Sequence, residues 1–474
     1  MKMKSNKKVM LLLSFFVVMI VMIAVSNVKT SAPDIGETLS SRFPKIDLKS
    51  GSEPSTTKPT RPPEPKTEKT KSSFDKDTLK KAKEVIDKKL GQMNFNGTFL
   101  VAVGDDIIYH QAWGYSDIDK KIPNTLDTKY EIGSCTKQFT ATAIAKLSQQ
   151  KKLSLEDSVT KYIKGLKISK DIKIRHLLNM CSGLYDYLND YINLLEADEL
   201  DADSKLSQKE LIEWVNNLGT YAKPGETFSY CNTNYYLMGM IIEKVSGKSY
   251  EQYIQDEIFY PLYMDNSSLR MSDTDSKGYL DNDWTKGLKV DSSYFYSAGE
   301  IVSTTTDMLK WLNAYSSGKV LDKDTLQKAT HVGKDGFNYG YGWFVTDDYY
   351  YHTGNTELYY AVDIVTRKRD IKIIGLTNIN ERELQQTALT LMTELRKLLF
   401  PQDNVPTEKP TEKPTKAPTE PPTEKPTEVP TEPPTEIPTE PPTEPEIIEE
   451  QVSNTPDENT ATDGEENNDN DEEG

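Results

Sequence analysis

Residues 132–147 read IGSCTKQFTATAIAKL, and this stretch carries the most structural information in the chain. Its apolar residues recur at the spacing of a helix that begins just after Gly133: Phe139, Ala143, Ile144 and Leu147. Ser134 would then lie at the helix N-terminus, where backbone N–H groups can face an oxyanion. Lys137 follows one helical turn later on the same face. A hydroxyl beside an ammonium group is a candidate nucleophile for acyl transfer.

The Ser-x-x-Lys pattern by itself is weak evidence, because it also occurs at Ser5/Lys8, Ser73/Lys76, Ser158/Lys161 and Ser316/Lys319. The alternative for any one match is a helix-capping serine with a solvated lysine. Ser134 differs in its position, directly after Ile132-Gly133 and at the head of a helical run. Its assignment depends on what else the chain offers.

Tyr230-Cys231-Asn232 offers a second group of polar residues. Two other Tyr-x-Asn matches exist, Tyr187-Leu188-Asn189 and Tyr191-Ile192-Asn193, but only Tyr230 follows a turn (Pro224-Gly225) and precedes a helical pattern. We expect Lys137 to favour the anionic form of the Tyr230 phenol, which would let it act as a base. Asn232 can donate to a substrate carbonyl. The alternative is a structural core tyrosine.

His352-Thr353-Gly354 is a third motif, and it follows the strand-like run Tyr349–Tyr351. Gly354 would let a ligand approach the strand edge closely, while His352 and Thr353 are expected to point donors into the groove. The alternative is a structural histidine. The three motifs together indicate an acyl-transfer site, whereas each one separately does not.

The net charge of the chain is distributed unevenly along the sequence. The chain has 474 residues and a net charge of −17, but residues 401–474 hold 22 Asp and Glu against 4 Lys, a net of −18, so the first 400 residues carry only +1. The sequence contains no basic stripe of the kind that binds nucleic acid, so it does not suggest a nucleic-acid partner.

The two ends of the chain read as export and spacer segments. Lysines precede the apolar run Val9–Val25, which is typical of a signal peptide or an N-terminal membrane anchor within 1–32. A Pro/Thr/Lys-rich linker is expected over 33–73. Residues 401–474 hold ten consecutive tetrads over Pro406–Pro445, nine of the Pro-Thr-Glu-x type and the third Pro-Thr-Lys-Ala, and an acidic end, which predicts a disordered spacer.

The folded domain is therefore expected over 74–400. A helix is predicted from Phe74 to Leu90 with Gly91 as its C-terminal cap, and a hairpin is predicted from strands 97–103 and 107–113. Ser154-x-x-Asp157 reads as a capping box, and Gly247 as the end of the helix after Tyr230. Strands are predicted again at 337–345, 349–352, 359–366 and 371–376, before a last helix that carries Leu384, Ala388, Leu391, Leu395 and Leu398. Strands at both ends suggest one sheet with an inserted helical lobe.

The cysteines and histidines exclude some site classes. Only Cys135, Cys181 and Cys231 occur, too few for a disulfide scaffold, although one pair among them is left open. The four histidines are scattered, without the spacing of zinc ligands. We therefore expect no metal and no cofactor.

The domain resembles the serine β-lactamase and penicillin-binding-protein superfamily, in its class C β-lactamase, DD-carboxypeptidase and esterase branch. Beyond the three motifs, the resemblance rests on a set of short segments: Ile174–Leu178, Ser182-Gly183-Leu184, Pro224-Gly225, Pro261-Leu262, Ser297-Ala298-Gly299, Ser303-Thr304, Tyr339–Trp343 and Thr377-Asn378. It implies an α/β (α+β) fold of the β-lactamase/transpeptidase type, with an antiparallel sheet flanked by terminal helices and an inserted helical lobe.

The resemblance also implies roles for the site residues. Ser134 would be acylated, Lys137 and Tyr230 would share the proton transfers, and Asn232 would hold the substrate amide. His352 would take the place of the lysine in the family's Lys-Thr-Gly strand. Backbone N–H groups of Ser134 and Asn355 would form the oxyanion hole.

Three departures bear on the substrate. His352 in place of lysine favours DD-carboxypeptidase-like or esterase-like members over dedicated β-lactamases. Cys231 replaces the usual serine of the second motif, and the segment after Gly354 lacks a glycine-rich turn.

We accordingly expect an exported serine hydrolase that acts on a peptide, amide or ester, such as a cell-wall D-Ala-D-Ala peptide or a β-lactam. Peptidoglycan is a candidate partner, the N-terminus is expected to contact the membrane, and the protein is expected to be a monomer. It would lie on the extracellular face of the membrane or be secreted. The alternative is a catalytically silent penicillin-binding or peptidoglycan-binding module.

Overall fold

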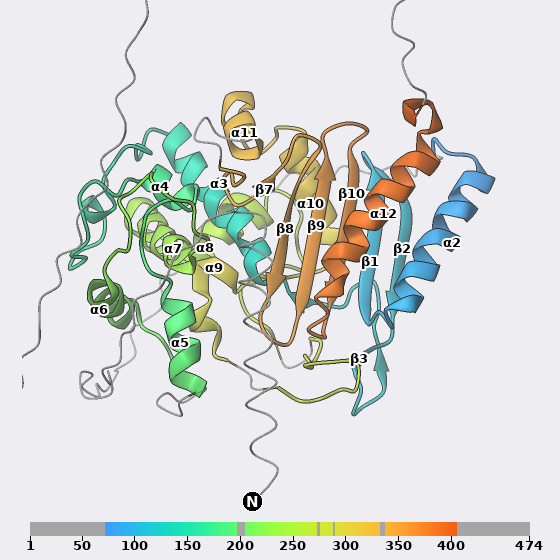
Figure 1. Ribbon diagram of the computed structural model, residues 1–474, viewed down its shortest axis with the longest axis horizontal. Coiled ribbons are helices and arrows are strands. Elements are labelled where there is room, and N and C mark those ends of the chain that lie inside the picture. Colours follow the sequence, from blue (N-terminus) through green and yellow to red (C-terminus); the bar gives the residue numbers. More distant parts are fainter. Residues whose placement is uncertain (1–71, 197–203, 273–274, 288–289, 332–336, 405–474) are drawn as a thin grey trace, which may run out of the picture. The chain divides into compact units, whose positions relative to one another are not determined.

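An antiparallel sheet of six strands organises the described part of the chain, in the order β2-β1-β10-β9-β8-β7 (Figure 1). The computed structural model describes residues 72–196, 204–272, 275–287, 290–331 and 337–404. The sheet strands are β1 (Gly97–Val103), β2 (Asp106–Trp113), β7 (Phe344–Val345), β8 (Tyr349–Asn355), β9 (Tyr360–Thr366) and β10 (Ile371–Thr377). Two small sheets pair β3 (Tyr115–Asp117) with β4 (Ile122–Pro123) and β5 (Tyr130–Glu131) with β6 (Val302–Ser303).

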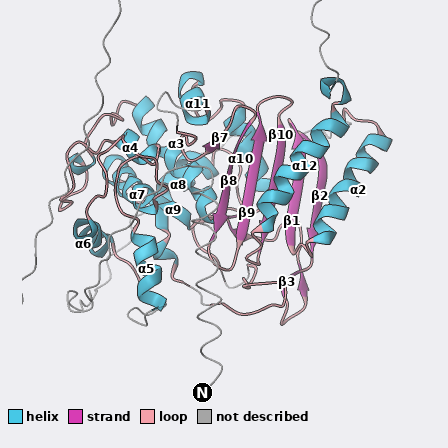
Figure 2. Cartoon of the chain, viewed as in Figure 1, coloured by secondary structure: helices cyan, strands magenta, loops and turns pink. Residues whose placement is uncertain are grey.

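The sheet joins segments that lie far apart in the sequence. β1 pairs with β10 in a register that runs from Gly97 opposite Thr377 to Val103 opposite Ile371. The long insertion between β2 and β7 supplies the helical lobe (Figure 2). The predicted mixed fold, an antiparallel sheet with terminal helices and a helical insertion, is therefore confirmed.

Helices cover both faces of the sheet (Figure 1). The terminal helices α2 (Lys76–Gln92) and α12 (Glu383–Leu399) contact each other on one face, and α10 (Thr305–Ser316) contacts β1 and β10 on the other. The remaining helices are α3 (Thr136–Gln149), α4 (Ile174–Leu178), α5 (Tyr187–Glu196), α6 (Gln208–Leu218), α7 (Asn232–Ser246), α8 (Tyr250–Ile254), α9 (Tyr296–Gly299) and α11 (Lys323–Thr330).

Two hydrophobic cores result, one on each face. Successive side chains of a strand point to opposite faces, so Phe99 and Val101 of β1 pack in the core beneath α2 and α12, while Leu100 and Ala102 pack in the core of the helical lobe. Both sets are fully buried. This explains why β1 is apolar along its whole length rather than alternating.

Several predicted elements are confirmed. The first strand spans Gly97–Val103 as predicted, and the last helix buries Leu384, Ala388, Leu391 and Leu395. Gly247 ends α7 with a φ of 72°, and its N–H donates to the Glu243 carbonyl.

Three predictions of local structure are wrong. Gly91 lies inside α2, which ends one residue later. Ser154 and Asp157 exchange hydrogen bonds in a turn that starts no α-helix. Of the predicted strand 337–345 only Phe344–Val345 forms, because Gly340 and Gly342 pack against the backbone of Ala329 and of Lys137-Gln138.

The signal or anchor segment, the linker and the Pro-Thr-Glu spacer lie outside the described residues. Among those that are described, no helix is long and apolar enough to cross a bilayer. Cys135, Cys181 and Cys231 are buried thiols, so the open question of a disulfide is answered: none forms.

Candidate active site

Ser134 lies in a 3-10 turn (Gly133–Cys135) that leads directly into α3. Gly133 has a φ of 49°, a value that favours glycine and directs the chain into the turn. The Lys137 ammonium donates to the Ser134 hydroxyl oxygen at 2.9 Å. The predicted placement of a hydroxyl and an amine one helical turn apart is therefore confirmed.

Lys137 is fully buried and makes two further hydrogen bonds. Its Nζ also donates to Asn232 Oδ1 and to the Ala298 carbonyl, both at 2.8 Å. Burial lowers its pKa to about 7, and the charge of Asp186 opposes that shift. Near neutral pH a large fraction of Lys137 is therefore the neutral amine, which can accept a proton from Ser134.

Tyr230 lies beside this pair, with Lys137 Nζ 4.9 Å from its ring centroid. Its hydroxyl is buried and has no hydrogen-bond partner among the described residues. Burial raises the pKa of Tyr230 well above its usual value, although the neighbouring Ser134 hydroxyl opposes the shift. The expectation that Lys137 would favour a phenolate is wrong, because desolvation outweighs the cation. Tyr230 is a proton donor in this state.

Asn232 is the first residue of α7, and both ends of its amide are engaged. Oδ1 accepts from Lys137, and Nδ2 donates to Asp186 Oδ2 at 2.8 Å. Asp186 thus fixes the amide orientation and leaves one N–H for a substrate carbonyl. The sequence analysis did not select Asp186, although it follows the motif Ser182-Gly183-Leu184 by two residues.

His352 is 1% exposed, and both of its ring nitrogens are used inside the protein. Nδ1 lies 2.6 Å from the Thr353 carbonyl, which can only accept, so Nδ1 carries the proton. Nε2 then accepts from the Tyr339 hydroxyl at 3.0 Å. Burial, with the Lys137 charge second, lowers the pKa of His352 to about 3. The imidazole is neutral.

Two expectations about this strand are therefore wrong. His352 points no free donor into the groove. Thr353 interacts with Tyr360, a residue of the core beneath α12. Neighbouring residues of a strand point to opposite faces, so His352 and Thr353 cannot share the groove.

Gly354 brings β8 close to the nucleophile, whereas its predicted role in the approach of a ligand stays a prediction. A methyl group at Gly354 would lie 1.9 Å from the Ile132 carbonyl oxygen and 2.9 Å from the Ser134 nitrogen, and one at Gly133 would lie 2.6 Å from the Asn355 nitrogen. The backbone N–H groups of Ser134 and Asn355 therefore come from two segments in direct contact. Such a pair suits an oxyanion.

A buried polar network lies behind these residues and was not foreseen. Gln138 Nε2 donates to both carboxylate oxygens of Asp363 at 2.8 and 2.7 Å, and Trp311 donates to Gln138 Oε1 at 2.7 Å. Asp363 also accepts from the backbone N–H of His352 at 3.2 Å. The network connects α3 to β8 and β9 immediately behind Ser134.

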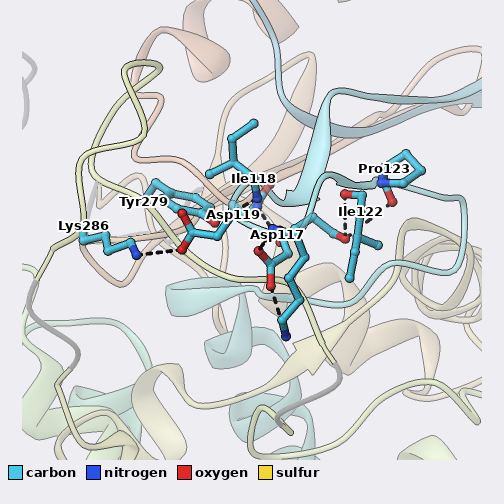
Figure 3. Close-up of polar contacts among 10 residues, drawn as sticks. Asp117, Ile118, Asp119, Ile122, Pro123, Tyr279 and Lys286 are labelled. Atoms are coloured by element: carbon cyan, nitrogen blue, oxygen red, sulfur yellow. Dashed lines mark hydrogen bonds and ion pairs between the residues drawn. The ribbon is translucent and has the colours of Figure 1, made fainter.

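A cavity of about 440 Å³ lies beside this centre, lined in part by Glu131, Phe295 and Thr356. Glu131 precedes Ser134 by three residues, and Thr356 follows Asn355. Figure 3 shows polar contacts that join the segment after β3 to two other lining residues: Lys286 pairs with Asp119 at 2.6 Å, and the Tyr279 hydroxyl accepts from the Ile118 N–H at 3.1 Å. The lining also includes four apolar side chains, among further polar ones: Met271, Val290, Phe295 and Leu358.

Comparison with known proteins gives concordant matches. Protein flp of Staphylococcus aureus is 28% identical over 321 residues, which are 63% of this chain and 62% of flp. The chain thus spans less than two thirds of the length of this relative. Penicillin-binding protein 4* of Bacillus subtilis is 34% identical over 195 residues, 40% of this chain and 42% of that protein.

Solved structures share the fold. The octameric penicillin-binding protein homologue from Pyrococcus abyssi matches with a TM-score of 0.59 and 29% identity, over 68% of this chain and 77% of that one. FmtA from Staphylococcus aureus matches with a TM-score of 0.58 and 23% identity, over 70% and 90% of the two chains. The family model "Beta-lactamase" matches residues 82–396, which include every motif described above, and the chain therefore belongs to the beta-lactamase family of serine hydrolases and penicillin-binding-like proteins.

Proposed function

We propose that this protein is a serine hydrolase that forms an acyl-enzyme on Ser134 and cleaves an amide, ester or peptide bond. The observation that carries the proposal is the Ser134–Lys137 pair: a 2.9 Å hydrogen bond to a buried amine whose pKa lies at about 7. The neutral amine takes the hydroxyl proton while Oγ attacks the substrate carbonyl.

The other residues have complementary roles in this mechanism. The N–H groups of Ser134 and Asn355 stabilise the tetrahedral oxyanion. Tyr230, protonated because its pKa is raised, donates its proton to the departing amine or alcohol. A water molecule then attacks the acyl-enzyme and gives a proton to Tyr230, while Lys137 returns its proton to Ser134 Oγ as the bond between Oγ and the acyl carbon breaks.

The neutral His352 supports a narrower substrate class. In the family pattern a lysine occupies this position, whereas here the imidazole is buried and uncharged. It offers no ion pair to a carboxylate on the leaving group. We therefore favour amides and esters whose leaving group carries no carboxylate, such as amino acid amides, ahead of D-Ala-D-Ala peptides and β-lactams.

A second candidate is a penicillin-binding module that is acylated without turnover. The 34% identity to penicillin-binding protein 4* over 40% of the chain supports this candidate. We further propose that the protein acts outside the cytoplasm. That proposal rests on the lysine-led apolar segment Val9–Val25.

The test compares the full-length protein with Ser134→Ala on p-nitrophenyl acetate, alanine p-nitroanilide, a D-Ala-D-Ala peptide, a chromogenic cephalosporin and labelled penicillin. The proposal expects Ser134-dependent turnover of the ester or anilide. Labelling by penicillin with no turnover of any substrate would favour the second candidate. Neither labelling nor turnover would refute both.

A further inference from the structure

A second cavity, of about 300 Å³, is lined by the same short helix that supports Lys137. The Ala298 carbonyl of α9 accepts a hydrogen bond from Lys137. Tyr296, at the start of α9, and Glu300, just after its end, line this cavity. The other walls come from α6, α7, α8 and the segments around residues 270 and 291–293. None of the catalytic candidates lines it.

The charged groups around the cavity are mostly acidic: Glu243, Glu251, Asp291 and Glu300, against Lys205 and Arg270. Three of the four carboxylates are engaged. Glu243 accepts from the Tyr250 N–H at 2.9 Å and from Gln208 at 2.7 Å, Glu251 pairs with Arg270 at 2.5 Å, and Asp291 accepts from the Ser293 N–H at 2.9 Å. Glu300 is the exception.

The Glu300 side chain is buried without a partner. The residue is 8% exposed, and within the described part of the chain its carboxylate accepts no hydrogen bond. The hydroxyl of Tyr296, on the same wall, is likewise buried; it makes no hydrogen bond within 3.5 Å among the described residues, and the charged group that acts on it most is the Glu243 carboxylate. Water can satisfy polar groups that line a cavity, and a ligand that donates hydrogen bonds can replace that water. Glu300 and Tyr296 therefore mark the wall on which such a ligand would bind.

We propose that this cavity binds a small organic cation through its primary ammonium group, with Glu300 as the ionic partner and the Tyr296 hydroxyl as a second acceptor. An ammonium group donates three hydrogen bonds and so matches two converging acceptors. A metal ion fits less well, because the described residues contain no group of three acidic, His or Cys side chains able to hold one. An anion is disfavoured by the surplus of carboxylates.

The size and charge of the cavity limit the ligand further. At about 30 Å³ per water-sized atom, 300 Å³ holds roughly ten non-hydrogen atoms. An amino acid, a lysine side chain or a simple alkylamine fits this limit. Burial first, and the neighbouring carboxylates next, raise the pKa of Glu300 to about 8, while Arg270 opposes the shift. A bound cation must therefore compete with a proton.

Calorimetric titration of the full-length protein with n-propylammonium chloride, at constant ionic strength, tests the proposal. 1-Propanol has the same number of heavy atoms and no charge, so it serves as the matched control ligand. We expect saturable binding of propylammonium only. Affinity should rise about tenfold or more from pH 6 to pH 9, because Glu300 loses its proton over this range while the alkylammonium keeps its own.

Variants assign the binding to this cavity. Glu300→Gln should abolish detectable binding, and Tyr296→Phe should weaken it several-fold. Glu156→Gln, which neutralises an exposed carboxylate paired with Arg175, should leave binding unchanged. Thermal unfolding of each variant shows that it is folded. Ser134→Ala should bind normally, since this inference does not depend on the proposed hydrolase activity. Absence of saturable binding, or equal binding by Glu300→Gln, would overturn the proposal.

Discussion

At the scale of single residues, the protonation of Lys137 reflects two opposing influences. Burial removes the ammonium from water and lowers its pKa to about 7, whereas the Asp186 carboxylate attracts the charge and raises it. The reaction needs the neutral amine, so kcat/KM should rise with pH through about 7. His352 should add no inflection near its ordinary pKa, because it stays neutral above about pH 3.

The substitution Asp186→Asn tests this balance. Asparagine keeps an oxygen that can accept from Asn232, removes the charge and replaces the other carboxylate oxygen, which accepts from the Leu188 N–H at 3.0 Å, by an amide NH2 group. Without that charge the ammonium form of Lys137 is less stable, so the pKa of Lys137 falls. The pH at which kcat/KM rises should therefore fall by roughly one unit. The measurement is kcat/KM on p-nitrophenyl acetate from pH 5 to 9. If the pH of this rise in kcat/KM did not change, or changed only as much as in the exposed control Glu156→Gln, the electrostatic role assigned to Asp186 would be contradicted.

At the scale of elements, catalysis depends on the contact between β8 and the turn that carries Ser134. Gly354→Ala should disrupt this contact, because the new methyl group would lie 1.9 Å from the backbone oxygen of Ile132, which no side-chain rotation relieves. A shift of about 1 Å in the oxyanion hole should lower acylation roughly 100-fold. Stopped-flow release of p-nitrophenol measures this step.

Gly91→Ala is the matched control for that variant. Gly91 lies within α2, and no atom would lie within 4 Å of the added methyl group. Alanine is the better helix former, so this change should raise the free energy of unfolding by about 0.5–1 kcal/mol and leave acylation unchanged. If Gly354→Ala acylated as fast as Gly91→Ala, the proposed role of the contact would be wrong.

The site residues that could be predicted are those marked both by a short motif and by a helix or turn pattern in the neighbouring sequence. Ser134 and Lys137 share one helical turn, and Tyr230 and Asn232 lie next to a turn and a helix start. Gln138 and Asp363 were missed because their contact joins residues 225 positions apart, and nothing in their local sequence marks them. The prediction for Tyr230 assumed a buried phenol but neglected the desolvation that burial brings, which is why the direction of its pKa shift was predicted wrongly.

The secondary structure could likewise be predicted in some segments and not in others. Runs with strong periodicity gave β1, β9, β10 and α12 close to their observed bounds. The run 337–345 is aromatic enough for a strand, yet its glycines make close backbone contacts with α3 and α11 that break the pairing. The opposite orientations of His352 and Thr353 could have been deduced from strand alternation alone.

At the scale of the whole domain, the sheet separates two cores with different tasks. The core beneath α2 and α12 is built from the two ends of the domain, whereas Tyr230 packs against the other core, which also contains Cys135 next to the nucleophile. Leu391 is fully buried in the core beneath α2 and α12, so Leu391→Ala should lower the free energy of unfolding by about 2–5 kcal/mol. That is a large share of the roughly 5–15 kcal/mol that domains possess.

Since the sheet stands between Leu391 and Ser134, the variant should keep its kcat/KM at temperatures where it is folded and lose activity only as it unfolds. Chemical denaturation followed by circular dichroism gives the stability, and ester hydrolysis at 15 °C gives the activity. Leu389→Ala, a change to a partly buried neighbour on the same helix, should have the same activity and a smaller loss of stability. A fall in kcat/KM of the folded Leu391→Ala protein, matched by no fall in Leu389→Ala, would mean that α12 positions the site through the sheet rather than only stabilising the domain.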